Sequence, residues 1–126
     1  MNNVNTSLEL FDEDVLSASD RQPILVDFWA EWCAPCRVIA PVLQRVIEDL
    51  DGRVGLVKLE VDRGENMKLA GHYRVRGFPT IILFHRGEEL GRFSGARSRP
   101  QVLHFIDEHL NAQGVFANHL PPRIRE

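Results

Sequence analysis

Two cysteines with two residues between them, Cys33 and Cys36, are the only thiols of the 126-residue chain. A thiolate in such a pair can attack another disulfide and then be released by its neighbour. The apolar run before them, residues 24–30, predicts a buried strand because it is short, continuous and partly β-branched. A helical pattern follows from Pro35, whose fixed φ and missing N–H suit the first turn of a helix. Cys33 is therefore predicted just before a helix N-terminus, where free N–H groups and the helix dipole favour the thiolate.

Three simpler explanations of the cysteine pair compete with thiol–disulfide exchange. A structural zinc site needs four ligands, but the chain has no second CxxC and its five histidines are scattered. A purely structural disulfide would close a very short loop, which removes little entropy from the unfolded chain and stabilises weakly. Cysteine as core filler is the third explanation, and the flanking Trp32 and the predicted helix start count against it. The spacing therefore favours a redox role, which needs no metal and no organic cofactor.

The composition is that of an ordinary globular domain, with 44% hydrophobic and 26% charged residues. A net charge of −3 implies no general attraction to nucleic acid, and no run of residues is apolar enough to span a membrane. Residues 1–20 lack the basic start and the apolar core of a signal peptide. Two cysteines at CxxC spacing without such a signal fit a reducing compartment, so we expect a cytoplasmic protein. We also expect a monomer.

The rest of the pattern predicts one domain over residues 1–110 and a tail over residues 111–126. In the first half of the chain the predicted elements are a weak strand around Val4, a short helix at 8–16, a loop at 17–20, a strand at 23–30 and a helix from Pro35 to about 51–52. In the second half they are a strand at 54–61, a helix at 62–72, strands at 77–84 and 89–93 joined by a turn at 86–88, and a helix from Ser98 to 110. Pro41 should bend the first long helix, and Gly52 should end it in the left-handed conformation. This order predicts an α/β fold in which parallel strands are followed by an antiparallel hairpin.

Asp27 is the second unusual residue, because it lies in the middle of a predicted strand between apolar neighbours. A charge there is costly unless it is satisfied, and desolvation should raise the pKa of this carboxyl. Asp27 could therefore accept the proton of Cys36. Alternatively, it is a structural carboxylate paired with Lys58, which interrupts the neighbouring apolar strand. Trp29, on the same strand face as Asp27, is expected in the core.

Taken together, these features resemble the thioredoxin family over about residues 8–110. The resemblance rests on residues 26–36 with their Trp-Cys-Ala-Pro-Cys end, on Pro41, on Lys58 with Asp62, on Arg-Gly-Phe-Pro-Thr at 76–80, and on Gly87, Gly95 and Ala96. It implies a thioredoxin fold, a central mixed β-sheet flanked by helices on both faces, in which Pro79 is cis and faces the cysteines. The chain departs from the family in having Ala34 in place of the usual Gly, a slightly longer 63–72 stretch, and the tail.

The resemblance also implies an activity, that of a protein-disulfide reductase. Cys33 would be the exposed nucleophile, and Cys36, one turn into the helix, would be shielded and would resolve the mixed disulfide. Asp27 and Lys58 would serve proton transfer. Substrates would contact a surface made of Trp32, Ala34, Pro35, Phe78, Pro79, Gly95 and Ala96. The implied partners are disulfide-containing proteins and a flavin-dependent, NADPH-consuming thioredoxin reductase.

Two alternatives stay open at this point. The same surface could dock a partner, so that the chain is a binding module or a partner-specific chaperone whose redox turnover is incidental. Separately, six arginines between Arg74 and Arg99 make the third quarter of the chain basic and could steer partners. A merely solvated surface is the simpler explanation of these arginines.

Overall fold

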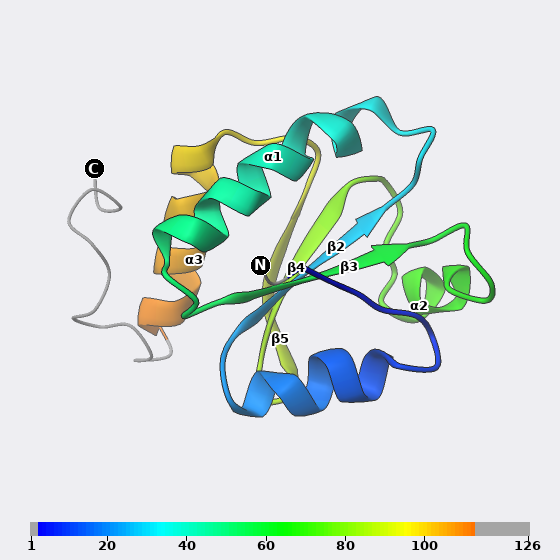
Figure 1. The fold of residues 1–126 in the computed structure, drawn as a ribbon, viewed down its shortest axis with the longest axis horizontal. Coiled ribbons are helices and arrows are strands. Elements are labelled where there is room, and N and C mark those ends of the chain that lie inside the picture. Colours follow the sequence, from blue (N-terminus) through cyan, green and yellow to red (C-terminus); the bar gives the residue numbers. More distant parts are fainter. Residues whose placement is uncertain (1–2, 113–126) are drawn as a thin grey trace.

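The computed structural model describes residues 3–112 and contains one five-stranded sheet in the order β1-β3-β2-β4-β5 (Figure 1). The strands are β1 (Asn3–Asn5), β2 (Ile24–Trp29), β3 (Gly55–Glu60), β4 (Thr80–His85) and β5 (Glu88–Ser94). β1, β3 and β2 run parallel, whereas β4 pairs antiparallel with both β2 and β5. The predicted mixed sheet, with parallel strands followed by a hairpin, is confirmed.

Helices cover both faces of this sheet (Figure 1). The long helices α1 (Ala34–Asp49) and α3 (Arg99–Ala112) pack together over one face, and side chains such as Leu25 and Phe105 form the core beneath them. The short elements η1 (Asp12–Ser17), η2 (Ala18–Asp20) and α2 (Met67–His72) contribute to the core of the other face, where Val26 and Phe28 lie. Alternate residues of β2 thus enter opposite cores, as the period of a strand requires.

Three predicted elements differ from the observed ones on the face that carries α2. Residues 17–20 were expected to form a loop, but η2 is a turn of 3₁₀ helix there, and the helix expected at 8–16 begins only at Asp12. The helix expected at 62–72 begins only at Met67. The preceding turn is held by Asn66, whose side chain accepts from the Leu8 N–H (2.8 Å) and donates to the Glu60 carbonyl (3.0 Å). These contacts join segments far apart in the sequence, so local periodicity could not reveal them.

The two long helices begin at or beside the residues that the sequence predicted, but each ends at a different residue from the one expected. α1 runs through Pro41 without a break and ends before Asp51 and Gly52, which are both left-handed (φ 53° and 79°). α3 begins with a reciprocal cap, because the Ser98 N–H donates to Gln101 Oε1 (2.9 Å) and the Gln101 N–H donates to Ser98 Oγ (3.3 Å). It ends two residues later than expected, so residues 111 and 112 are helical rather than part of the tail.

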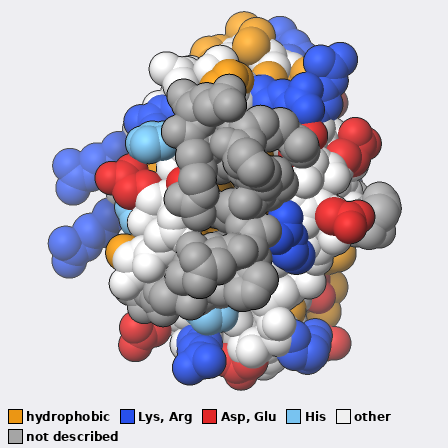
Figure 2. Space-filling view, turned by 90° about the vertical axis from the view of Figure 1, so that its left-hand side faces the viewer, with side chains coloured by type: hydrophobic (Ala, Val, Ile, Leu, Met, Phe, Trp, Pro, Cys, Tyr) orange, Lys and Arg blue, Asp and Glu red, His pale blue; other side chains and the backbone are white. Residues whose placement is uncertain are grey.

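The face of the molecule on the α3 side carries charges of both signs. Figure 2 shows Lys, Arg, Asp and Glu side chains interspersed around the residues left grey. The rest of the expected tail, residues 113–126, lies outside the described residues. Within residues 3–112, no helix combines the length and the apolarity needed to cross a membrane.

Candidate functional site

Cys33 and Cys36 form a disulfide at the N-terminus of α1. Cys33 is the N-cap residue with extended backbone angles, and Pro35 stands in the first turn, as predicted. The Cys36 N–H donates to Cys33 Sγ at 3.2 Å, so the sulfur takes the place that a Ser or Asp oxygen occupies in most helix caps. This N–H and the helix dipole would stabilise negative charge on Cys33 Sγ once the disulfide is reduced.

The expected difference in exposure between the two cysteines is wrong for this disulfide form. Cys33 is 4% exposed and Cys36 is 3% exposed, and both belong to the same core as Val26 and Phe28. In the turn before the helix the Cys33 N–H donates to the Ala30 carbonyl (3.2 Å), and Ala30, Cys33 and Cys36 belong to one buried cluster. The exposed residues of the motif are its neighbours Trp32, Ala34 and Pro35.

Trp32 is 66% exposed and is held in place from two sides. Its indole N–H donates to Asp62 Oδ2 at 2.7 Å, and its ring meets the Phe78 ring edge-on at 5.9 Å. Asp62 was part of the sequence motif, but sequence reasoning gave it no role. The contact arises because β2 and β3 are parallel neighbours, so the segments that follow them emerge at the same end of the sheet.

The segment before β4 lies beside the segment after β5. The Phe78–Pro79 peptide bond is cis, and the Pro79 carbonyl accepts from the Gly95 N–H at 2.9 Å. Gly95 has a φ of 86°, which favours glycine at this contact. Thr80, a residue to which the sequence assigned no role, braces the turn by donating from Oγ1 to the Gly77 carbonyl (2.6 Å). Together with the Trp32–Phe78 contact, these bonds bring the predicted substrate-contacting residues, the exposed Ala96 included, to the end of the sheet at which Cys33 lies.

Asp27 is 1% exposed in the middle of β2, and neither of its carboxyl oxygens has a hydrogen-bond partner among the described residues. Burial raises the pKa of this carboxyl from its ordinary 3.8 to about 7, against the opposing charge of Lys58. Lys58 is its neighbour in register on β3, but no ion pair within 4 Å joins the two among residues 3–112. The structural alternative, a closed Asp27–Lys58 ion pair, is therefore not what this structure contains.

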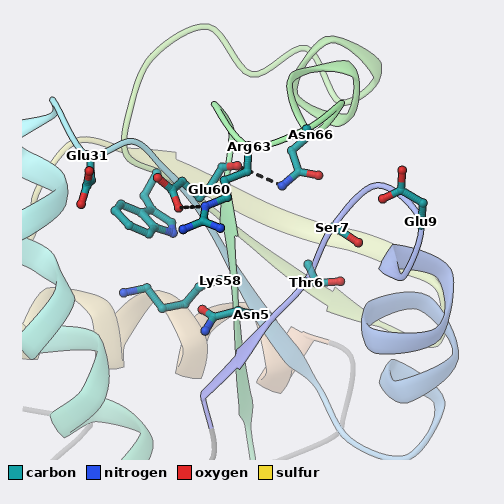
Figure 3. Close-up of a pocket in the computed structure, with 11 residues that line it drawn as sticks. Asn5, Thr6, Ser7, Glu9, Glu31, Lys58, Glu60, Arg63 and Asn66 are labelled. Atoms are coloured by element: carbon teal, nitrogen blue, oxygen red, sulfur yellow. Dashed lines mark hydrogen bonds and ion pairs between the residues drawn. The ribbon is translucent and has the colours of Figure 1, made fainter.

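Lys58 instead faces Trp29 and a pocket at the edge of the sheet. Its ammonium lies 5.1 Å from the centroid of the Trp29 ring, which is half-buried rather than in the core as expected. The pocket has a volume of about 550 Å³. Figure 3 shows Lys58 beside Asn5, its neighbour in register on β1, and Glu60 beside Arg63, to which it is bonded. No cysteine lines this pocket, so it is separate from the disulfide. Within residues 3–112, no group of three or more His, Cys, Asp or Glu side chains is placed to hold a metal ion.

Comparison with known proteins adds similarity over most of the chain. The family model described as Thioredoxin matches residues 2–108. A thioredoxin of Pseudomonas aeruginosa is 43% identical over 107 residues, which cover 85% of this chain and 95% of that protein. Thioredoxin C-2 of Corynebacterium nephridii is 42% identical over 107 residues, with the same two coverages of 85% and 95%. A thioredoxin of Rickettsia bellii is 34% identical over 106 residues, covering 84% of this chain and 97% of that protein.

Proposed function

The chain belongs to the thioredoxin family, and from this membership we infer that it reduces disulfide bonds of other proteins through Cys33 and Cys36. The observation that carries the inference is the Cys33–Cys36 disulfide at the start of α1, with the Cys36 N–H bonded to Cys33 Sγ. Such a pair can exist as a dithiol or a disulfide, and the helix N-terminus favours the thiolate form of the N-cap residue, Cys33.

The exchange proceeds in two balanced steps. In the reduced chain, the Cys33 thiolate attacks one sulfur of a substrate disulfide, and the other substrate sulfur leaves as a thiolate that takes up a proton. Cys36 then loses its proton and attacks Cys33 Sγ, which expels the second substrate thiolate. Two electrons pass to the substrate, and the chain is left with the Cys33–Cys36 disulfide, the form present in this structure.

Asp27 is proposed as the acceptor of the Cys36 proton. Its carboxyl is buried and lacks a hydrogen-bond partner, and its pKa of about 7 lies where a group can both take up and release a proton near neutral pH. Lys58 lowers the pKa of Asp27 from the value that burial alone would produce. We therefore assign Lys58 the role of keeping the Asp27 carboxyl within the range useful for catalysis.

The substrate is proposed to lie across Trp32, Phe78 and Pro79, with Gly95 and Ala96 beside them and Ala34 and Pro35 at the helix start. Trp32 supports this assignment because it is a large apolar ring that is exposed yet fixed by Asp62. Pro79 immediately precedes β4 and is buried, so the substrate would meet this part of the surface mainly through the half-buried Phe78 and the backbone beside it. The dithiol would be regenerated by a thioredoxin reductase that consumes NADPH, and the cytoplasm is the compartment proposed for this cycle.

Reduction of insulin tests these proposals directly, because the freed B chain precipitates and scatters light. The wild-type chain should accelerate precipitation with dithiothreitol, and also with NADPH and a bacterial thioredoxin reductase. The Cys33→Ser and Cys36→Ser variants are matched controls and should add nothing to the dithiothreitol rate. Acceleration with dithiothreitol alone would contradict the reductase partnership. No acceleration with either reductant would contradict the reductase function and favour the binding module.

A further inference from the structure

Arg74 occupies a backbone position that normally belongs to glycine. It follows the end of α2 with a φ of 58°, and the Val75 N–H donates to the Ala70 carbonyl (2.8 Å) while the Arg74 N–H donates to the Gly71 carbonyl (3.1 Å). These two bonds define a Schellman motif with Arg74 at its left-handed residue. A residue with a Cβ is held there at a conformational cost that glycine avoids. The backbone of this turn therefore gives no reason for the choice of arginine.

Arg74 precedes Phe78 by four residues, and two further arginines are nearer to the site along the chain. Arg76 precedes Phe78 by two residues, and Arg97 follows Gly95 by two residues. Two residues span at most about 7 Å, so both arginine backbones lie close to the Phe78–Trp32 contact and the Gly95–Pro79 bond. The Arg97 guanidinium is held over the Phe93 ring at 4.4 Å, which limits its freedom.

These three arginines, Arg74, Arg76 and Arg97, are exposed, and none has a carboxylate within ion-pair distance among residues 3–112. By contrast, the guanidinium groups of Arg63, Arg92 and Arg99 each have a carboxylate within 3.0 Å. Uncompensated positive charge therefore remains on the Phe78–Pro79 side of the site.

The Trp32 side of the site carries charges of both signs, because Glu31 is exposed and Asp62 is bonded to the indole N–H, while the Arg37 guanidinium donates to the Glu31 carbonyl (2.5 Å). The net charge of the whole chain is −3, so its overall field would repel acidic partners rather than attract them. A preference for acidic substrates would therefore have to arise locally, from the three arginines.

We propose that Arg74, Arg76 and Arg97 select protein disulfides whose cysteine is flanked by Asp or Glu on the side that lies over Phe78 and Pro79. This selection rests on the proposed reductase function and names its substrate class. Complementary charge at the rim of a contact raises the association rate and disfavours partners of the wrong sign. The arginines thus act on encounter and orientation and take no part in the exchange of sulfur bonds.

The test measures how fast the reduced chain reduces three synthetic peptides, each a disulfide-linked homodimer. The peptides differ only in the two residues on one side of cysteine, which are Glu, Gln or Lys. A second set of three carries the same changes on the other side, and only one of the two sets is expected to discriminate. Each rate constant is divided by the rate constant for dithiothreitol, which also attacks as a thiolate but carries no other charged group, to remove the effect of the flanks on the disulfide and on an approaching thiolate. The normalised rate should be ~10-fold higher for the Glu peptide than for the Lys peptide in low salt, and the ratio should shrink toward one in 0.5 M salt.

Variants assign the effect to the three arginines. Arg76→Gln combined with Arg97→Gln should lower the Glu-to-Lys ratio, whereas the matched control, Arg21→Gln combined with Arg45→Gln, should keep it. Arg74→Gly should lower the ratio while raising the melting temperature, and Arg74→Lys should keep the ratio. A purely structural role for Arg74 would predict no change in the ratio with either substitution.

Equal normalised rates for the three peptides in both sets would overturn the selection while leaving the reductase function intact. A control variant that loses the ratio as fully as the Arg76 and Arg97 variant would overturn the assignment to these residues. If the reduced chain reduces no peptide at all, the proposed function fails, and the selection fails with it.

Discussion

Replacing Asp27 with asparagine should stabilise the protein by an amount that depends on pH. In the unfolded chain the carboxyl loses its proton near its ordinary pKa of 3.8, whereas in the folded chain it keeps the proton up to about pH 7. Between these values the unfolded state binds fewer protons than the folded state, so the free energy of unfolding falls as pH rises. A shift from 3.8 to about 7 corresponds to a loss of about 4 kcal/mol at 1.36 kcal/mol per pH unit.

The Asp27→Asn variant does not undergo this loss. The stability difference between variant and wild type should therefore grow from pH 4 to pH 7, by at most ~4 kcal/mol, and then stay constant. Burying the amide has its own cost, but that cost is the same at every pH. Urea denaturation of the oxidised proteins at pH 4, 5.5, 7 and 8.5 measures the difference, since the disulfide-bonded cysteines do not titrate.

A control variant and a turnover measurement test the burial of Asp27 and its role in proton transfer separately. Glu108→Gln, at an exposed position on α3, is the matched control and should change the free energy of unfolding by less than ~0.5 kcal/mol. If Asp27 accepts the proton of Cys36, the variant should also reduce disulfides more slowly than wild type at neutral pH. A stability difference that is the same at pH 4 and pH 8.5 would refute the reasoning from burial. Unchanged turnover with lower stability would refute the proton-transfer role.

Four other expectations can be checked with standard assays. Cys36→Ser should accumulate mixed disulfides with cell proteins that reductant dissolves, and Cys33→Ser should trap far less; equal trapping would show that the assigned roles are wrong. With Ala34 between the cysteines, the pair should remain in the disulfide form in a glutathione buffer poised at about −230 mV, and a stably reduced pair would contradict a reducing potential. Phe105→Ala should lower the free energy of unfolding by ~3–5 kcal/mol in urea denaturation, because the ring is 4% exposed and packs edge-on against a phenylalanine of β5 at 5.1 Å. Ser98→Ala should lower it by only ~1 kcal/mol, because only the helix cap is lost.

The parts of the fold that the sequence predicted are those in which local pattern and tertiary packing agree. The apolar run at 24–30 became β2, and the 3.6-residue periods after Pro35 and Ser98 became α1 and α3. The segment at 62–66 was missed because its conformation depends on Asn66 and its bonds to Leu8 and Glu60. Such bonds override local helix propensity and leave no periodic signal.

The candidate site shows the same division. The helix start at Cys33 and the burial of Asp27 could be inferred from neighbours in sequence. The Trp32–Asp62 bond and the half-buried state of Trp29 could not, because both depend on which strands lie side by side. The burial of Cys33 was missed for a different reason: a helix N-terminus predicts favourable charge on the sulfur but does not determine how exposed that sulfur is.

The strand directions also place the disulfide at one end of the sheet and leave the opposite end without any residue of the candidate site. The segments after β2, β3 and β5 and the segment before the antiparallel β4 emerge at one end of the sheet, and together they carry the disulfide, Trp32 and Pro79. The turn at 51–53 lies at the opposite end, removed by the length of a six-residue strand, or roughly 20 Å. A fluorescent reporter or an immobilisation handle inserted at this exposed turn would leave the surface that meets substrates uncovered.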